Sequence, residues 1–131
     1  MPTQTIGADT PEWAVGDTAP PLSILLTDGA GDPLNGLDGA TVVINVAHMS
    51  YDYYYAPQNR IINASPCVVD PDQTNNKGHI TWTPSVGDFF LAGTFRFTFE
   101  VTYGDGTVQT IAPNSTNTMI VRAPVGGMQF A

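Results

Sequence analysis

The segment "GTFRFTFEVTYGDGT", residues 93–107, has the clearest structural pattern in the chain. Apolar and polar side chains alternate along it, and a period of two is typical of a β-strand with one buried face. Gly and Asp at residues 104–106 favour a tight turn, and apolar residues recur at 108–111. The segment therefore predicts a β-hairpin. The expected core face of its first strand consists of Phe95, Phe97, Phe99, Val101 and Tyr103.

Shorter alternating segments occur along the rest of the chain, separated by Gly, Pro, Asn and Asp. No amphipathic helix of 10 or more residues is indicated. Seven or eight short strands with frequent turns are typical of an antiparallel β-sandwich. The strands expected besides the hairpin are 22–27, 40–48, 60–64, 67–70, 79–83 and 117–124, and one core is expected to contain Ile24, Val42, Ile44, Ile80, Trp82, Phe95, Phe97 and Phe99.

The composition suits one domain and excludes several classes of partner. The chain has 131 residues, with 12 acidic and 4 basic side chains and a net charge of −8. Binding to nucleic acids or to anionic membranes depends on clustered Lys and Arg, and the four cations here are scattered along the sequence. Only 12% of the residues are charged, which leaves neutral surface that a protein partner could cover.

The residues capable of chemistry lack the spacing of a catalytic or metal site. Cys67 is the only cysteine, so no intrachain disulfide forms, and we expect a small buried apolar residue. His48 and His79 fall at a strand end and a strand start, where structural or exposed positions are expected. Asp88 and Glu100 are the acids nearest to aromatic residues, but Glu100 faces away from the Phe row. The sequence therefore predicts no enzyme activity, no cofactor and no metal.

Two loops are rich in Asp and Asn, whose side-chain oxygens could bind calcium. The loop "DPDQTNNKG", residues 70–78, departs from an EF-hand because Asn75 replaces the required Gly and Thr81 replaces the bidentate acid. A looser calcium site in the first long loop is an alternative, although turn formation by Asp and Asn explains the same residues. The oxygen ligands of that alternative site would be Asp28, Asp32, Asn35 and Asp38.

Four tyrosines crowd the segment "SYDYYYAPQNR", residues 50–60. Tyrosine provides a large rigid contact area with a polar tip, which suits a loop that binds a neighbouring subunit or a sugar. Alternatively, three of them face the core from one side of a strand. The candidate contact residues are Tyr51, Tyr53, Tyr54 and Tyr55.

Both ends of the chain are rich in Gly, Pro and Thr, and each carries apolar side chains. We expect residues 1–15 and 124–131 to form flexible terminal arms with no elements of their own, which insert Trp13, Met128 and Phe130 into other chains. The alternative is a frayed terminus folded onto its own domain. The first residues lack the basic start and apolar centre of a secretory signal, so synthesis in a cytoplasm is expected.

The order of motifs resembles the immunoglobulin-like N-terminal domain of the phage baseplate upper protein family. The matching motifs are "GDT" at 16–18, "DGATV" at 38–42, Gly78-Ile80-Trp82 in "GHITW", and "AGTFRFTFEVTYGDG" at 92–106. The resemblance covers residues 16–123 and implies an immunoglobulin-like β-sandwich. The chain differs from the family pattern in stopping soon after this region and in its longer, Tyr-rich middle.

The resemblance implies a non-enzymatic structural protein of a tailed-phage virion, made in the host cytoplasm. Its partners would be other virion proteins, including copies of itself, at the tail tip or baseplate. A head decoration protein, a carbohydrate-binding module that adheres to the host surface, and a bacterial surface domain are the alternatives. These motifs determine a fold rather than a reaction, so they bear on function only by analogy.

Overall fold

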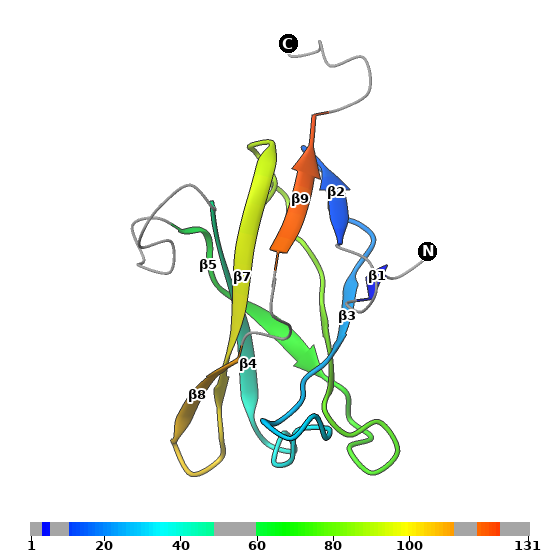
Figure 1. Cartoon of the computed structure of the whole chain (residues 1–131), viewed down its shortest axis with the longest axis vertical. Coiled ribbons are helices and arrows are strands. Elements are labelled where there is room, and N and C mark those ends of the chain that lie inside the picture. The colour runs from blue at the N-terminus through cyan, green and yellow to red at the C-terminus, as the bar shows by residue number, and fades with distance from the viewer. Residues whose placement is uncertain (1–3, 6–10, 49–59, 112–117, 124–131) are drawn as a thin grey trace.

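The computed structural model describes residues 4–5, 11–48, 60–111 and 118–123. These residues form nine β-strands and no helix (Figure 1). No helix among them is long and apolar enough to cross a membrane. The strands are β1 (Gln4–Thr5), β2 (Glu12–Ala14), β3 (Leu22–Leu25), β4 (Thr41–His48), β5 (Arg60–Val69), β6 (His79–Trp82), β7 (Gly93–Thr102), β8 (Val108–Ile111) and β9 (Thr118–Arg122).

The strands form one continuous curled sheet in the order β1-β3-β6-β5-β4-β7-β9-β2, with β8 also paired to β7. Strand β5 joins the two halves, because its first part pairs with β4 and its last two residues pair with β6. The half that contains β3 and β6 packs against the half that contains β4 and β7, which gives a sandwich-like fold. The prediction of an all-β sandwich is confirmed.

The quoted segment forms the predicted hairpin. Strands β7 and β8 are antiparallel, with Thr102 opposite Val108. Two backbone hydrogen bonds close the turn, from Tyr103 N to Thr107 O at 2.8 Å and from Gly106 N to Tyr103 O at 2.9 Å. The turn predicted at 104–106 is therefore present. Along its other edge, β7 pairs with β4 over eight residues.

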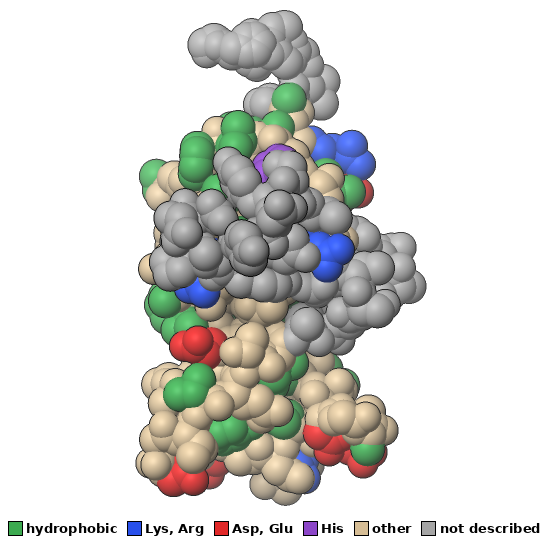
Figure 2. Space-filling model, turned by 60° about the vertical axis from the view of Figure 1, so that its left-hand side comes forward, with side chains coloured by type: hydrophobic (Ala, Val, Ile, Leu, Met, Phe, Trp, Pro, Cys, Tyr) green, Lys and Arg blue, Asp and Glu red, His purple; other side chains and the backbone are tan. Residues whose placement is uncertain are grey.

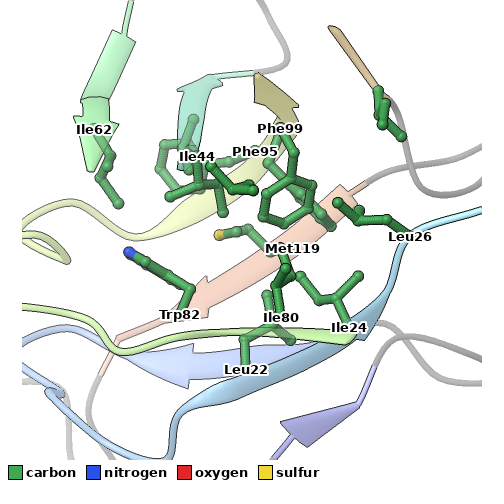
Figure 3. Packing of buried hydrophobic residues seen from close by; sticks show 14 of the residues in the cluster. Leu22, Ile24, Leu26, Ile44, Ile62, Ile80, Trp82, Phe95, Phe99 and Met119 are labelled. Carbon is green, nitrogen blue, oxygen red and sulfur yellow. The ribbon is translucent and has the colours of Figure 1, made fainter. Parts of the chain in front are cut away.

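The core lies between the two halves of the sheet (Figure 3). Each half contributes alternate residues of its strands, as a period-two pattern requires. All eight residues predicted for the core are buried, which confirms the facing assigned to the four strands that contain them. Their exposed fractions are 0% for Ile44, Trp82, Phe95, Phe97 and Phe99, 1% for Ile24 and Ile80, and 2% for Val42.

Strand β5 differs from its prediction, because residues 60–64 and 67–70 were expected to form two separate strands. It runs through Pro66, which lies opposite Val43 of β4. The other edge of β5 pairs with β6 only at Val68 and Val69. Proline is compatible with a strand where one edge has no ladder to complete, so Pro66 does not end β5.

A β-bulge in β5 depends on one buried amide. The register shifts between Ile44 and Val46 of β4, and Ala64 in the bulge has a positive φ of 54°. The Ala64 N–H donates a hydrogen bond of 2.7 Å to Oδ1 of Asn45, which is only 4% exposed. The side-chain oxygen of Asn45 therefore accepts a hydrogen bond from the Ala64 N–H, which the bulge removes from the strand ladder.

The described residues among the first fifteen form two strands, and both pairings are parallel. Strand β1 pairs with β3, and β2 pairs with β9. The prediction that residues 1–15 form an arm without elements is therefore wrong for Gln4–Thr5 and Glu12–Ala14. Strands of two and three residues are too short to show a periodic pattern, and their pairing depends on partners far away in the sequence.

Candidate interaction surface

Trp13 lies in the core rather than on a free arm. Its side chain is 3% exposed, and its ring stacks on Phe89 with 5.0 Å between ring centroids. The rings of Trp13 and Trp82 pack edge to face, with 5.9 Å between their centroids. Trp13 Nε1 donates a hydrogen bond of 2.9 Å to the carbonyl oxygen of Pro20. The expectation that Trp13 is an exposed anchor for another chain is therefore wrong.

The strand that carries Trp13 is fixed along its length. The N–H of Val15 donates to Arg122 O at 2.9 Å, and the N–H of Ile120 donates to Pro11 O at 3.0 Å. At the surface, Nε of Arg122 lies 2.6 Å from Oε1 of Glu12. The hydrogen bond from Arg122 lowers the pKa of Glu12. Strand β2 is thus an integral edge of the sheet.

The other candidate contact residues lie outside the described residues. These are Tyr51, Tyr53, Tyr54 and Tyr55 in the middle of the chain, with Met128 and Phe130 near its end. Their assignment as partner contacts stays a prediction.

Three exposed apolar side chains lie in the segment between β6 and β7, residues 83–92, which we call the apolar loop. The exposed fractions are 92% for Val86, 61% for Phe90 and 46% for Leu91. The neighbouring Phe89 points the other way and is 1% exposed, so the loop is held by one aromatic ring and presents the next one to solvent. Sequence reasoning missed this surface, although two adjacent phenylalanines cannot both face the core of an extended segment.

The loop is anchored by hydrogen bonds as well as by Phe89. The N–H of Gly16 donates to Phe89 O at 2.8 Å. Within the loop, the N–H of Ser85 donates to Oδ2 of Asp88 at 2.7 Å, and the N–H of Asp88 donates to Ser85 O at 3.0 Å. The exposed side chains are therefore presented by a loop with a defined backbone.

Three loops meet at the opposite end of the sandwich, which we call the acidic end. They are residues 26–40, 70–78 and 103–107, and the register brings their strands together, with Leu25 opposite His79 and Thr41 opposite Thr102. Figure 2 shows most of the acidic side chains of one face towards the lower end, whereas hydrophobic side chains occur along its whole length. The acidic end contains Lys77 and six aspartates, Asp28, Asp32, Asp38, Asp70, Asp72 and Asp105.

The aspartates at the acidic end hold turns. Oδ1 of Asp28 accepts hydrogen bonds from the N–H groups of Ala30 at 2.9 Å and Asp32 at 3.0 Å. Residues of this loop were the alternative calcium ligands, and turn formation accounts for the position of Asp28. Among the described residues, no group of three or more His, Cys, Asp or Glu could hold a metal ion.

The other two loops at the acidic end use carboxylates in the same way. Oδ1 of Asp72 accepts from Asn75 N at 3.0 Å, and Oδ1 of Asp105 accepts from the Thr107 hydroxyl at 2.6 Å. These bonds favour the charged carboxylate, so the pKa of Asp72 is lowered first by the Asn75 backbone and the pKa of Asp105 first by the Thr107 side chain.

The side chains that are capable of chemistry take part in packing or in a turn. Burial raises the pKa of the Cys67 thiol to about 12, so the thiol stays protonated at neutral pH and is a poor nucleophile. The ring of His48 packs edge-on against Phe95, with 5.2 Å between centroids. Asp88 accepts the Ser85 N–H described above.

No protein-family model matches the chain, and no curated protein is significantly similar to it. The described part of the chain is a sandwich with an exposed apolar loop at one end and six aspartates at the other.

Proposed function

We propose that this protein is a non-enzymatic structural component of a tailed-phage virion, an immunoglobulin-like module that docks onto other virion proteins at the tail tip or baseplate. The observation that carries the proposal is the resemblance of residues 16–123 to the N-terminal domain of the baseplate upper protein family. An all-β sandwich is the architecture that this resemblance implies.

Parts of three motifs that carry the resemblance lie at turns of the fold. In "GDT", Oδ2 of Asp17 accepts the N–H of Ala14 at 2.9 Å. In "DGATV", the N–H of Ala40 donates to Leu37 O at 3.0 Å. In "YGDG", Gly106 closes the β7–β8 hairpin. Motifs of this kind specify an architecture, and they support a role in which a stable module is held in an assembly.

The use of the described carboxylates also supports a structural role. An enzyme of this composition would be expected to place carboxylates towards a reacting centre. Instead, six aspartates each accept a backbone N–H within a loop or turn: Asp17, Asp28, Asp70, Asp72, Asp88 and Asp105.

Mass spectrometry of purified particles tests the proposal. Particles produced from the genome that encodes this chain should contain it at a fixed ratio to the tail proteins. Tailless heads from a tail-assembly mutant should lack it, because the docking partners are absent. Equal amounts in heads and whole particles would favour head decoration instead, and its absence from both would contradict the proposal.

Adhesion to the host surface is the second candidate, because the sequence places four tyrosines within residues 51–55. Aromatic rings that stack on sugars are sensitive to truncation. Tyr53→Ala and Tyr54→Ala should leave the binding of particles to host polysaccharide unchanged if the protein is structural. Loss of polysaccharide binding, with normal amounts of the variant in the particle, would favour adhesion.

A further inference from the structure

One asparagine of the first long loop is followed by glycine. Asn35 and Gly36 form the only Asn-Gly pair in the sequence. Both residues are exposed. Within the described part of the chain, no hydrogen bond holds the Asn35 side chain or the Gly36 N–H. The side-chain amide of Asn35 and the backbone nitrogen that follows it are therefore accessible to each other and to water.

The fold requires glycine at position 36. Its φ is +85°, a left-handed conformation that residues with a Cβ rarely adopt. A Cβ at this position would also lie 3.3 Å from Cε1 of the Tyr103 ring. Glycine leaves its own backbone nitrogen without a side chain to shield it, so the geometry of the turn also gives Asn35 a reactive neighbour.

We propose that Asn35 is a site of spontaneous deamidation, a covalent modification that converts its side-chain amide into a carboxylate. The Gly36 nitrogen forms a bond to Cγ of Asn35, the bond from Cγ to Nδ2 breaks, and the Gly36 proton leaves with Nδ2 as ammonia. Water then opens the resulting succinimide ring, at one carbonyl to aspartate and at the other to isoaspartate. The reaction needs only water, and it does not depend on the proposed function.

Both products change the acidic end. Each adds one negative charge to a loop that already contains Asp32 and Asp38. Isoaspartate also routes the backbone through the side-chain carbon, which adds one backbone atom between Leu34 and Leu37. These leucines are 5% and 1% exposed. A longer connection between two buried anchors disturbs their packing, so isoaspartate should destabilise the fold more than aspartate does.

Asn75, in another loop of the acidic end, is a matched control within the same molecule. It is also exposed. Its Nδ2 donates a hydrogen bond of 2.9 Å to Oδ2 of Asp72, and the residue that follows it is Asn76 rather than glycine. Asn75 therefore lacks both of the features that make Asn35 reactive.

Peptide mapping by mass spectrometry tests the proposal on the folded wild-type protein, incubated at pH 8.5 far below its melting temperature. Mildly alkaline solution favours loss of the Gly36 proton. A synthetic peptide of residues 33–37 sets the time scale. When the peptide is fully converted, most of Asn35 in the protein should be aspartate or isoaspartate, and Asn75 should still be an amide. An intact Asn35 at that time would overturn the proposal, as would equal conversion of Asn35 and Asn75.

Two variants separate the added charge from the altered backbone. Asn35→Asp carries the charge on a normal backbone and should melt close to the unmodified wild type, whereas the isoaspartate fraction of the incubated protein should melt at a lower temperature. Asn35→Ser cannot form the succinimide and should keep its elution position in ion-exchange chromatography throughout the incubation. A shift of Asn35→Ser as large as that of the wild type would assign the new charge to another residue and overturn the proposal. An isoaspartate fraction that melts like Asn35→Asp would overturn the predicted effect on the loop.

Discussion

At the residue scale, Gly78 occupies a junction between two loops of the acidic end. Its carbonyl accepts the N–H of Leu26 at 2.9 Å, and Leu26 O in turn accepts the N–H of Leu34. The φ of Gly78 is +82°, and a Cβ at this position would lie 2.7 Å from Leu26 O. Because the clash would be with backbone, no side-chain movement could relieve it.

We therefore expect Gly78→Ala to destabilise the protein by about 1–3 kcal/mol, the cost of a strained backbone position. Chemical denaturation of the purified variant measures this loss. Gly29→Ala is the matched control, since nothing lies within 4 Å of a Cβ there. Equal stability of both variants and the wild type would show that the loops do not meet at Gly78 as described.

The turn carboxylates make stability depend on pH. Hydrogen bonds lower the pKa of Asp72 and Asp105 below the ordinary value of 3.8. A lowered pKa in the folded state contributes stability above the unfolded pKa, and this contribution is lost as pH falls through the folded pKa. The melting temperature should therefore fall as the pH is lowered below about 4.

The double variant Asp72→Asn and Asp105→Asn tests the cause of that fall. An amide oxygen can accept the same hydrogen bonds but does not titrate, so the variant should lose less of its melting temperature between pH 5 and pH 3 than the wild type does. Parallel pH profiles for the two proteins would assign the acid sensitivity to other groups.

Sequence predicts the facing of Phe95 and Phe97 better than that of Trp13 or Phe90. The two phenylalanines belong to a long alternating segment, in which each apolar residue supports the assignment of the next. Trp13 has no such neighbours, and its burial depends on stacking with Phe89, which lies 76 positions later in the sequence. Contacts between distant short segments leave no local pattern, so the sequence does not predict the burial of Trp13.

At the element scale, strand β2 shows how a short segment can be integral to the fold. Its three residues pair with β9, and Trp13 brings an indole ring into the core. We expect Trp13→Ala to cost about 3–5 kcal/mol, as removal of large buried aromatic side chains does. Thermal or chemical denaturation measures this cost.

Deletion of residues 1–15 extends the same test, because it removes β1, β2 and the indole together. The deletion should destabilise the domain at least as much as Trp13→Ala. The control is Glu12→Ala, which removes an exposed partner of Arg122 and should change stability little. A deletion variant that melts like the wild type would restore the arm hypothesis for the N-terminus.

The elements that were predicted well and those that were not differ in length and regularity. Strand β7 has ten residues and a regular alternation. Strand β5 has the same length, but its bulge at Ala64 and its proline interrupt the period, and the sequence therefore indicated two strands. Strand β5 stays continuous because it pairs with β4 and because Asn45 of β4 accepts the N–H of Ala64. Both of these partners lie elsewhere in the chain.

At the scale of the whole molecule, the described aspartates are concentrated at one end of the sandwich. The apolar loop and the acidic end lie at opposite ends of the same strands. The length and composition predicted a single neutral-surfaced domain, but the separation of charge appears only when the three acidic loops are brought together by the fold.

A cryo-electron microscopy reconstruction of the tail tip and baseplate, from particles that contain this chain, tests this account most directly. Density for the sandwich should be found at a defined position against the neighbouring tail proteins. A reconstruction that resolves all the tail proteins and contains no such domain would contradict the proposed function.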